Sequence, residues 1–322
     1  MRLLRMLCLA AFGVVAAQTV SADTYPSRPI SVIVPVPPGA ANDLAARLIG
    51  EIITAQTGQP VVINNRSGAG GLIGMSMAAK AAPDGYTLLV ASSGQITTTR
   101  LLFKNPILDP IADLEPIAPV MDQQIVAAIN KDVPARTFAD FVALVKARPG
   151  QFNYTSAGPG SAVHLAGDQL LRRAGINLAH VPYRGAAPAL TDVVAGRVQM
   201  ITLGPNSLMP HIRSGAVRPL AIASNKRMSY LPEVPSAAEA GVPGWELSVW
   251  FGLFGPRGLP KEVVDKLNEY VQKLQNDPAS IKRMKESFMD LMAMSPQQFA
   301  RFVHDESVKW ERIVKDAGLQ PQ

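Results

Sequence analysis

The chain has 322 residues, of which 48% are hydrophobic and 17% charged, enough for one large domain or two ordinary ones. Its formal net charge is +6, but the basic residues form no stripe of the kind that nucleic-acid-binding proteins carry, so we expect no nucleic-acid partner. The one cysteine, Cys8, lies so early that a processed chain would have no disulfide, thiolate metal site or thiol nucleophile.

The first residues are typical of a secretory leader. Residues 1–22 read "MRLLRMLCLAAFGVVAAQTVSA", with two arginines, an apolar run, and then Val20 and Ala22 at the positions before a cleavage site. The apolar run is too short for a membrane span. We predict a signal peptide that is cleaved between Ala22 and Asp23. Because Arg5 stands where a lipoprotein signal needs a small apolar residue, we expect the mature protein to be unlipidated.

After residue 22, short β-branched runs alternate with helical stretches. The first strand is expected at 30–36, followed by an amphipathic helix that ends at Gly58. Further strands are expected at 60–65 and 87–92, with a helix that runs through Ala79 between them. Strands that alternate with helices indicate a mostly parallel sheet, whose ligands gather at the carboxyl ends of the strands.

The same pattern then begins again. A long strand at 118–130 carries the chain into a second set of strands, and another at 245–256 is expected to bring it back. Strands of the second set are expected within 152–157, 178–183, 198–204 and 218–224, and helices within 137–150, 261–275 and 295–318. We therefore predict two α/β lobes, each a mostly parallel sheet with flanking helices, hinged at the two crossing strands. Lobe 1 comprises residues 23–124 and 250–322, and lobe 2 comprises 125–249.

Two loops place bare backbone amides at the head of a helix. The first loop, Pro38–Asp43, lies within "VPVPPGAANDLAARL", and the second loop, Ser156–Ser161, lies within "NYTSAGPGSAVHL". The first amides of a helix lack hydrogen-bond partners, and the helix dipole is positive there, so such a place attracts an anion.

In the first loop, Gly39, Ala40 and Ala41 are small enough for a ligand to approach the main chain. Asn42 is a candidate N-cap, and Asp43 in the first turn complements the dipole, so a purely structural role in capping remains open.

The second loop has the same openness. Gly158 and Gly160 free the main chain around Ala157, and the hydroxyl groups of Ser156 and Ser161 add donors. Ser92 and Ser93 follow the strand at 87–92 and are candidates for the same site because they lie at its carboxyl end.

The segment "GAGGLIG", residues 68–74, does not have the spacing of the dinucleotide fingerprint, and no acidic residue follows at the required interval. We interpret its glycines as positions of close packing between helix and sheet, and we expect no cofactor.

The four histidines, His164, His180, His211 and His304, are scattered singly and form no metal-binding pair at helical spacing, so we expect no metal. Ser161 and His164 lie one helical turn apart, which leaves a secreted serine hydrolase open as an alternative. No third group is apparent to orient the histidine, and a polar wall of the binding site or a packed helix residue is its other interpretation. Arg184 follows a strand and is either a partner for a carboxylate or a structural residue.

Several motifs together resemble one family. They are "YPSRPISVIVPVPPGAANDLAARLIG", "VVINNRSGAGGLIGMSMAAKAAPDGYTLLVAS", "NYTSAGPGSAVHLAGDQL", "HVPYRGAAPALTDVVAGRVQM" and "GWELSVWFGLFGPRGLP". In this order and spacing they are similar to the receptors of tripartite tricarboxylate transporters, the Bug-type solute-binding proteins. The resemblance covers essentially the entire mature chain. It implies a monomeric periplasmic binding protein of type II-like fold that closes on a small carboxylate and delivers it to membrane transporter subunits, or else reports it to a sensor protein.

The resemblance also assigns the two loops. In this family both grip a ligand carboxylate through main-chain amides, hydroxyl groups and water, which points to Pro38–Asp43 and Ser156–Ser161. The chain departs from the family pattern at Ala40, Ala41 and Asn42, where a second glycine and a hydroxyl residue are usual. It also has Gly204, followed by Pro205 and Asn206, where an aspartate is frequent, so Gly204 and Asn206 are the candidate ligand-binding residues at this position. Loss of that acid weakens the case for an amino-acid ligand and leaves a plain mono- or dicarboxylate, or an uncharged relative, open.

Overall fold

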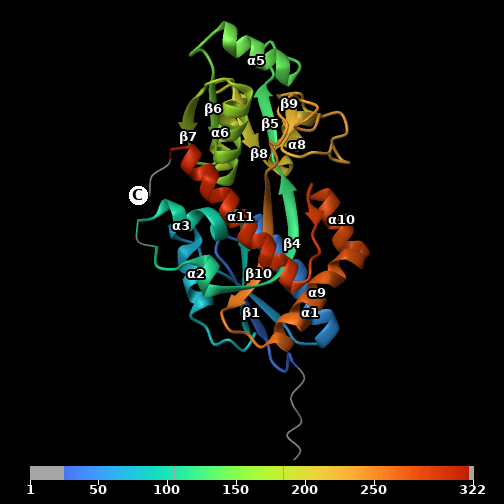
Figure 1. Cartoon of the computed structure of the whole chain (residues 1–322). Coiled ribbons are helices and arrows are strands. Elements are labelled where there is room, and N and C mark those ends of the chain that lie inside the picture. Colours follow the sequence, from blue (N-terminus) through green and yellow to red (C-terminus); the bar gives the residue numbers. More distant parts are fainter. Residues whose placement is uncertain (1–24, 105, 184, 319–322) are drawn as a thin grey trace, which may run out of the picture.

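The computed structural model describes residues 25–104, 106–183 and 185–318, which form two lobes stacked along one axis (Figure 1). The predicted signal peptide lies outside the described residues. Each lobe is built on one mixed β-sheet with helices on its faces, so the predicted two-lobed α/β fold is confirmed. Among the described residues, no helix combines the length and the apolar character that a bilayer crossing requires.

Lobe 1 contains a six-stranded sheet in the order β11-β4-β10-β3-β1-β2. Its strands are β1 (Ile30–Val34), β2 (Val61–Asn65), β3 (Thr87–Ser92), β4 (Leu114–Gln124), β10 (Ser248–Pro256) and β11 (Asp290–Leu291). Its helices are α1 (Ala41–Thr57), η1 (Ala69–Gly71), α2 (Leu72–Ala79), η2 (Gly94–Thr98), α3 (Thr99–Leu102), α4 (Pro110–Asp113), α9 (Lys261–Lys273), η3 (Leu274–Asn276), α10 (Pro278–Glu286) and α11 (Pro296–Asp316). The pairings make β1 to β4 point the same way and β10 and β11 the opposite way.

Lobe 2 contains a five-stranded sheet in the order β7-β6-β8-β5-β9. Its strands are β5 (Val126–Asn130), β6 (Asn153–Ser156), β7 (Ala179–Pro182), β8 (Met200–Leu203) and β9 (Val217–Ile222), and its helices are α5 (Phe138–Ala147), α6 (Ala162–Ala174), α7 (Ala186–Val194) and α8 (Pro205–Arg213). Only β5 runs against the other four strands. It starts at the junction and leaves it, whereas β6 and β8 run back toward it, so the carboxyl ends of the two sheets face each other.

The chain crosses between the lobes at Ile125 and near Leu247. The sequence predicted one strand over 118–130, but the strand is interrupted at Ile125, between β4 and β5. The carbonyl of Ile125 accepts from the amide of Ala223 at 2.8 Å, and the carbonyl of Ala223 accepts from the amide of Leu247 at 3.0 Å. On the lobe 1 side, Gln124 pairs directly with Ser248. Both crossings therefore meet in one narrow junction.

The last helix, α11, spans both lobes (Figure 1). Phe299 and Val303, near its start, pack with Trp250 of lobe 1. Trp310, farther along, belongs to the core of lobe 2. The predicted division gave all of residues 250–322 to lobe 1, whereas Trp310, Ile313 and Val314 pack in the core of lobe 2. The helix is a third connection between the lobes.

Candidate functional site

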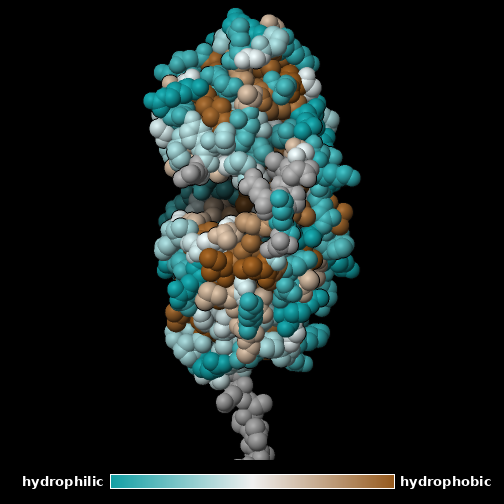
Figure 2. All heavy atoms as spheres, turned by 90° about the vertical axis from the view of Figure 1, so that its left-hand side faces the viewer, coloured by the Kyte–Doolittle hydropathy of each residue, from teal (hydrophilic) through white to brown (hydrophobic). Residues whose placement is uncertain are grey.

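A cleft of about 400 Å³ lies between the lobes, where the carboxyl ends of the two sheets face each other. Figure 2 shows this hollow from the side on which it opens. Its walls are Gly70, Ser92, Gly94, Gln95, Thr98, Thr99 and Leu102 from lobe 1, Ala157 to Val163 from lobe 2, and Val249 of β10. None of these described lining residues carries a charged side chain. The cleft has the size of a site for a small molecule, and its polar groups are hydroxyl groups, one amide and main-chain amides.

The second loop forms the lobe 2 wall of this cleft. Gly158 has a φ of +125° and Gly160 a φ of +74°, conformations that favour glycine. Ser161 is the N-cap of α6: its Oγ accepts from the amide of His164 at 3.2 Å and donates to the carbonyl of Gly158 at 2.7 Å. The hydroxyl thus holds the loop together, whereas the sequence predicted a free donor. The amides of Ala162 and Val163, in the first turn, have no acceptor within the helix. Both residues line the cleft, at the positive end of the helix dipole.

Ser161 and His164 do not form the pair that a serine hydrolase needs. The Nδ1 atom of His164 accepts from the amide of Gly160 at 3.1 Å, and the Ser161 hydroxyl donates to a carbonyl instead. Ser156 is fully buried, and its Oγ lies 3.0 Å from Nε2 of His180. The fold brings the rings of His164 and His180 together, with their centroids 4.1 Å apart, although the two residues lie far apart in the sequence. No group of three or more His, Cys, Asp or Glu among the described residues is placed to hold a metal ion.

The first loop has a different role in the described structure from the one predicted. The N-cap of α1 is Ala40, which makes no side-chain cap, so the prediction of Asn42 as the N-cap is wrong. Asn42 is buried, and its Nδ2 donates to Oε1 of Gln95 at 2.9 Å. The same oxygen accepts from the amide of Ser92 at 2.9 Å. Asn42 therefore fixes a side chain of the cleft wall, while Pro38–Asp43 are not themselves among the lining residues.

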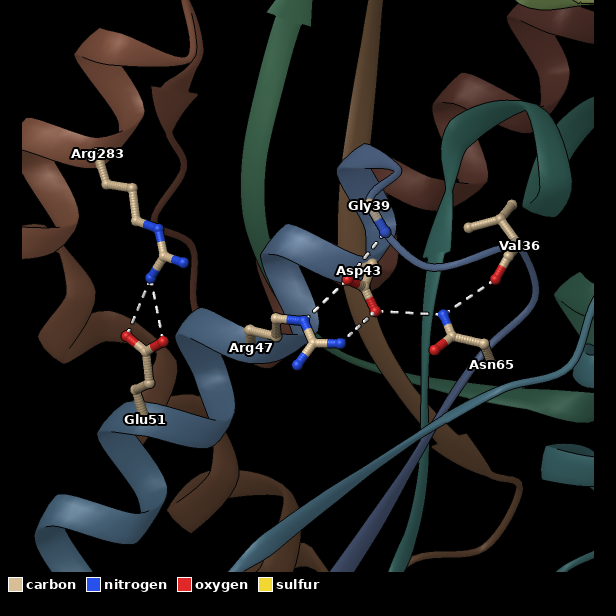
Figure 3. Close-up of polar contacts among 7 residues, drawn as sticks. All are labelled: Val36, Gly39, Asp43, Arg47, Glu51, Asn65 and Arg283. Carbon is tan, nitrogen blue, oxygen red and sulfur yellow. Dashed lines mark hydrogen bonds and ion pairs between the residues drawn. The ribbon is translucent and has the colours of Figure 1, made fainter.

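The carboxylate of Asp43 holds the first loop in place through hydrogen bonds (Figure 3). It accepts from the amide of Gly39 at 3.1 Å, from Nε of Arg47 at 2.8 Å and from Nδ2 of Asn65 at 3.2 Å. Burial alone would raise the pKa of Asp43, but these hydrogen bonds, that of Arg47 first, outweigh it and lower the pKa. Nδ2 of Asn65 also donates to the carbonyl of Val36 at 3.0 Å. The loop is thus tied to both α1 and β2, and the carboxylate is occupied in holding it.

The other predicted residues that the structure describes are not among the lining residues of the cleft. Ser93 is fully buried, and its Oγ has no partner in the described structure. Gly204 is the N-cap of α8, and a Cβ there would overlap the side chain of Gln123. Asn206 is exposed, and its Oδ1 accepts from the amide of Ser207 at 2.8 Å. Arg184 lies outside the described residues.

Besides Gly70, Ala162, Val163 and Val249, the prediction missed five lining residues: Gly94, Gln95, Thr98, Thr99 and Leu102. They lie on η2 and α3, directly after the carboxyl end of β3. The sequence "SSGQITTT" at this point is polar and follows a buried strand, which is the signal that could have found them. Of the predicted set, Ser92, Ala157, Gly158, Gly160 and Ser161 do meet at this one cleft.

The sequence and the fold of this chain are similar to those of known proteins. The model of the tripartite tricarboxylate transporter family receptor, TctC, matches residues 45–319. Protein BugT of Bordetella pertussis is 35% identical over 94% of this chain and 94% of its own.

Two solved structures from Rhodopseudomonas palustris have the same fold. The structure of Rpa4515 with adipate is 34% identical, with a TM-score of 0.82 over 92% of this chain and 100% of that chain. The structure of MatC with bound malate is 32% identical, with a TM-score of 0.76 over 90% of this chain and 100% of that chain. The family match and these likenesses span nearly all of the described residues. The chain belongs to the tripartite tricarboxylate transporter receptor family.

Proposed function

We propose that the protein captures a small carboxylate in the cleft between its lobes and delivers it to a membrane transporter of the tripartite tricarboxylate type. One observation carries this proposal: the head of α6, with its glycine-containing loop, opens into a cleft whose described lining has no charged side chain. A helix N-terminus offers unpaired amide donors and a positive dipole end, so it favours an anion without a cationic side chain.

A dicarboxylate is the ligand class that this site fits best. The cleft is bounded by polar groups from both lobes, with Ser92, Gln95 and Thr99 opposite the head of α6. One carboxylate can therefore lie at α6 while the other end of the ligand meets lobe 1. The adipate and malate in the two related structures are dicarboxylates of a size that this cleft accommodates. In our proposal the protein acts as a monomer in the periplasm, after removal of residues 1–22.

The first prediction concerns binding without turnover. Adipate or malate should raise the melting temperature, because a ligand that binds only the folded state stabilises it. At a hundredfold excess over the dissociation constant, the gain is about 2.7 kcal/mol. Differential scanning fluorimetry across a panel of carboxylates measures it, with the matching amides and alcohols as controls.

The same samples test the alternative of a secreted hydrolase. After a long incubation, mass spectrometry should return each ligand chemically unchanged. Formation of a product that Ser161→Ala abolishes would overturn the binding proposal, and so would a panel in which no carboxylate shifts the melting temperature.

The second prediction concerns the hinge. Because both crossings meet in one narrow junction, near Ile125 and Leu247, we expect the lobes to rotate as rigid bodies around the ligand. Small-angle scattering should show a smaller radius of gyration at saturating ligand than without it. An unchanged radius at saturation would mean that the cleft is closed beforehand, and hinge closure would have to be abandoned.

A further inference from the structure

Two histidines and a tyrosine are stacked beneath the second loop. The ring centroids of His164 (α6) and His180 (β7) are 4.1 Å apart, and Tyr154 (β6) lies 4.9 Å from His180 and 6.3 Å from His164. His164 is 7% exposed and Tyr154 is 3% exposed, so both are part of the lobe 2 interior, whereas His180 on the edge strand β7 is half-buried. Neither histidine lines the interlobe cleft.

Each histidine holds one end of the loop. Nδ1 of His164 accepts from the amide of Gly160 at 3.1 Å. Nε2 of His180 lies 3.0 Å from Oγ of Ser156, and that oxygen accepts from the amide of Gly158 at 3.3 Å. The positions of both loop glycines therefore depend on the imidazole rings below them. The amides of the α6 head follow directly after Gly160, so any movement there displaces them as well.

This arrangement requires an uncharged His164. A neutral imidazole has one nitrogen that accepts, whereas both nitrogens of an imidazolium are donors. Protonated Nδ1 would face the amide hydrogen of Gly160, and the hydrogen bond would become a repulsive contact. Two charged rings at 4.1 Å would also repel each other. The hydroxyl of Ser156 can donate or accept, so its contact with His180 is less sensitive to that ring's charge.

The surroundings keep the pair neutral near pH 7. Burial lowers the pKa of His164, and the charge of Asp168 on the same helix opposes this in part. Burial and the charge of His164 lower the pKa of His180 to about 4, again opposed by Asp168. Asp168 is itself bound by Arg172, at 2.7 Å.

The other charged groups near Asp168 belong to α6 and α11. They are Arg173, Arg312 and Asp316, which line the same surface pocket as Asp168 and Arg172. Tyr154 of β6 packs against both histidines. Asp168 is thus the one described acid whose charge raises the pKa of both rings.

We propose that His164 and His180 are positioning residues that form a proton-sensitive clamp: the neutral pair holds the second loop in its binding geometry, and protonation of His164 releases the loop and its ligand. The release of a ligand in this inference rests on the proposed function, whereas the release of the loop does not, because the loop geometry is independent of what binds. Acidification around the cell would then lower the receptor's affinity without any change in the ligand's concentration.

The direction follows from the depressed pKa of His164. The pKa of a free histidine is about 6.5, and below this pH the released loop takes up a proton that the clamped loop excludes. The clamp is therefore fully stable above pH 6.5, and its stability is lost as the pH falls from there through the lower pKa of His164 in the folded protein. Where one proton must be excluded for binding, the dissociation constant rises about tenfold per pH unit below the folded pKa. Affinity should be flat from pH 8 to 7.

The first test uses the ligand-free protein. Hydrogen exchange measured by NMR should show the Gly160 amide protected at pH 7, and losing protection relative to its neighbours in α6 as the His164 ring titrates. His164→Gln places an acceptor that does not titrate near Gly160 and should keep the protection at low pH. His304→Gln, at an exposed histidine of α11, is the matched control and should behave like the parent.

The second test measures adipate affinity by calorimetry between pH 7.5 and 4.5. Adipate's own carboxyl groups take up protons in this range, so the readout is the ratio of the parent's dissociation constant to that of His164→Gln. We expect this ratio to stay near one at pH 7.5 and to rise by about tenfold per pH unit once the pH lies below the folded pKa of His164. His164→Leu, which lacks the acceptor, should bind weakly at every pH.

Two outcomes overturn the clamp. One is a Gly160 amide whose protection ignores the titration of His164, and the other is a His164→Gln variant with the parent's pH profile. If adipate binds neither protein while the amide still responds to pH, the clamp stands and the proposed ligand class fails.

Discussion

Replacing Gly160 by valine will strongly weaken ligand binding and leave the lobes folded. Gly160 has a φ of +74°, a region that a β-branched residue rarely adopts. A Cβ at this position would also lie 2.5 Å from Cδ1 of Leu102, which comes from α3 in the opposite lobe. The added bulk therefore stands where the two lobes meet at the wall of the cleft. We expect a loss of affinity on the order of a hundredfold or more, about 2.7 kcal/mol, measured by calorimetric titration with adipate.

Gly175 is the matched control for this variant. It is the C-cap of α6, with a φ of +62°, and a Cβ there would meet nothing within 4 Å. Gly175→Val therefore shares the backbone strain, on the order of 1–2 kcal/mol, without the approach to the other lobe. It should lower the melting temperature and leave affinity unchanged. Circular dichroism should show both variants folded.

A double variant separates the contact with Leu102 from the strain. Gly160→Ala adds only the Cβ, and Leu102→Ala removes the atoms that this Cβ would meet. The double variant should therefore bind the ligand better than Gly160→Ala alone.

Ser161→Ala should weaken binding only in part, because it removes the cap of α6 and leaves the helix amides. If Gly160→Val binds like the parent while Arg184→Ala binds nothing, the carboxylate lies on the arginine and the loop is only a turn.

The order of strands and helices could be predicted because local patterns encode it. The run at 87–92 is β3, and the amphipathic helix ends at Gly58, whose φ is +71°. The break at Ile125 could not be predicted, since an apolar run is the same whether it stays in one sheet or passes to another. The break falls where the chain leaves its pairing with β10 and begins to pair with β9, and both of these partners lie far along the chain.

The two loops of the site could be found in the same way, but the partners of their side chains could not. Asn42 has the chemistry of an N-cap, yet its amide is drawn to Gln95, which the third strand brings beside it. His180 lies beside Tyr154 because β6 and β7 pair in parallel, and α6 brings His164 against both rings. Such contacts depend on register between elements, which no local pattern specifies.

The predicted lobe boundary assigned all of α11 to lobe 1 and missed its contact with the core of lobe 2. Trp310 is fully buried in the lobe 2 core, and its Nε1 donates to Oε2 of Glu306 at 3.1 Å. The same oxygen accepts from Nε1 of Trp250, on the crossing strand β10, also at 3.1 Å. One carboxylate thus joins the end of α11 to the strand that connects the lobes.

Trp310→Ala should therefore be the most destabilising of the variants considered. Removing a fully buried tryptophan costs about 3–5 kcal/mol through lost burial and the remaining cavity, and it frees the end of α11 from lobe 2. Val308→Ala, on the same helix but 55% exposed, should change stability by no more than about 0.5 kcal/mol. Urea unfolding followed by fluorescence and by circular dichroism measures both. We expect the two signals to separate in Trp310→Ala, because lobe 2 loses its connection to lobe 1 through α11 and unfolds first. Equal midpoints for the two variants would mean that α11 contributes nothing to the union of the lobes, and closure would then depend on the two strand crossings alone.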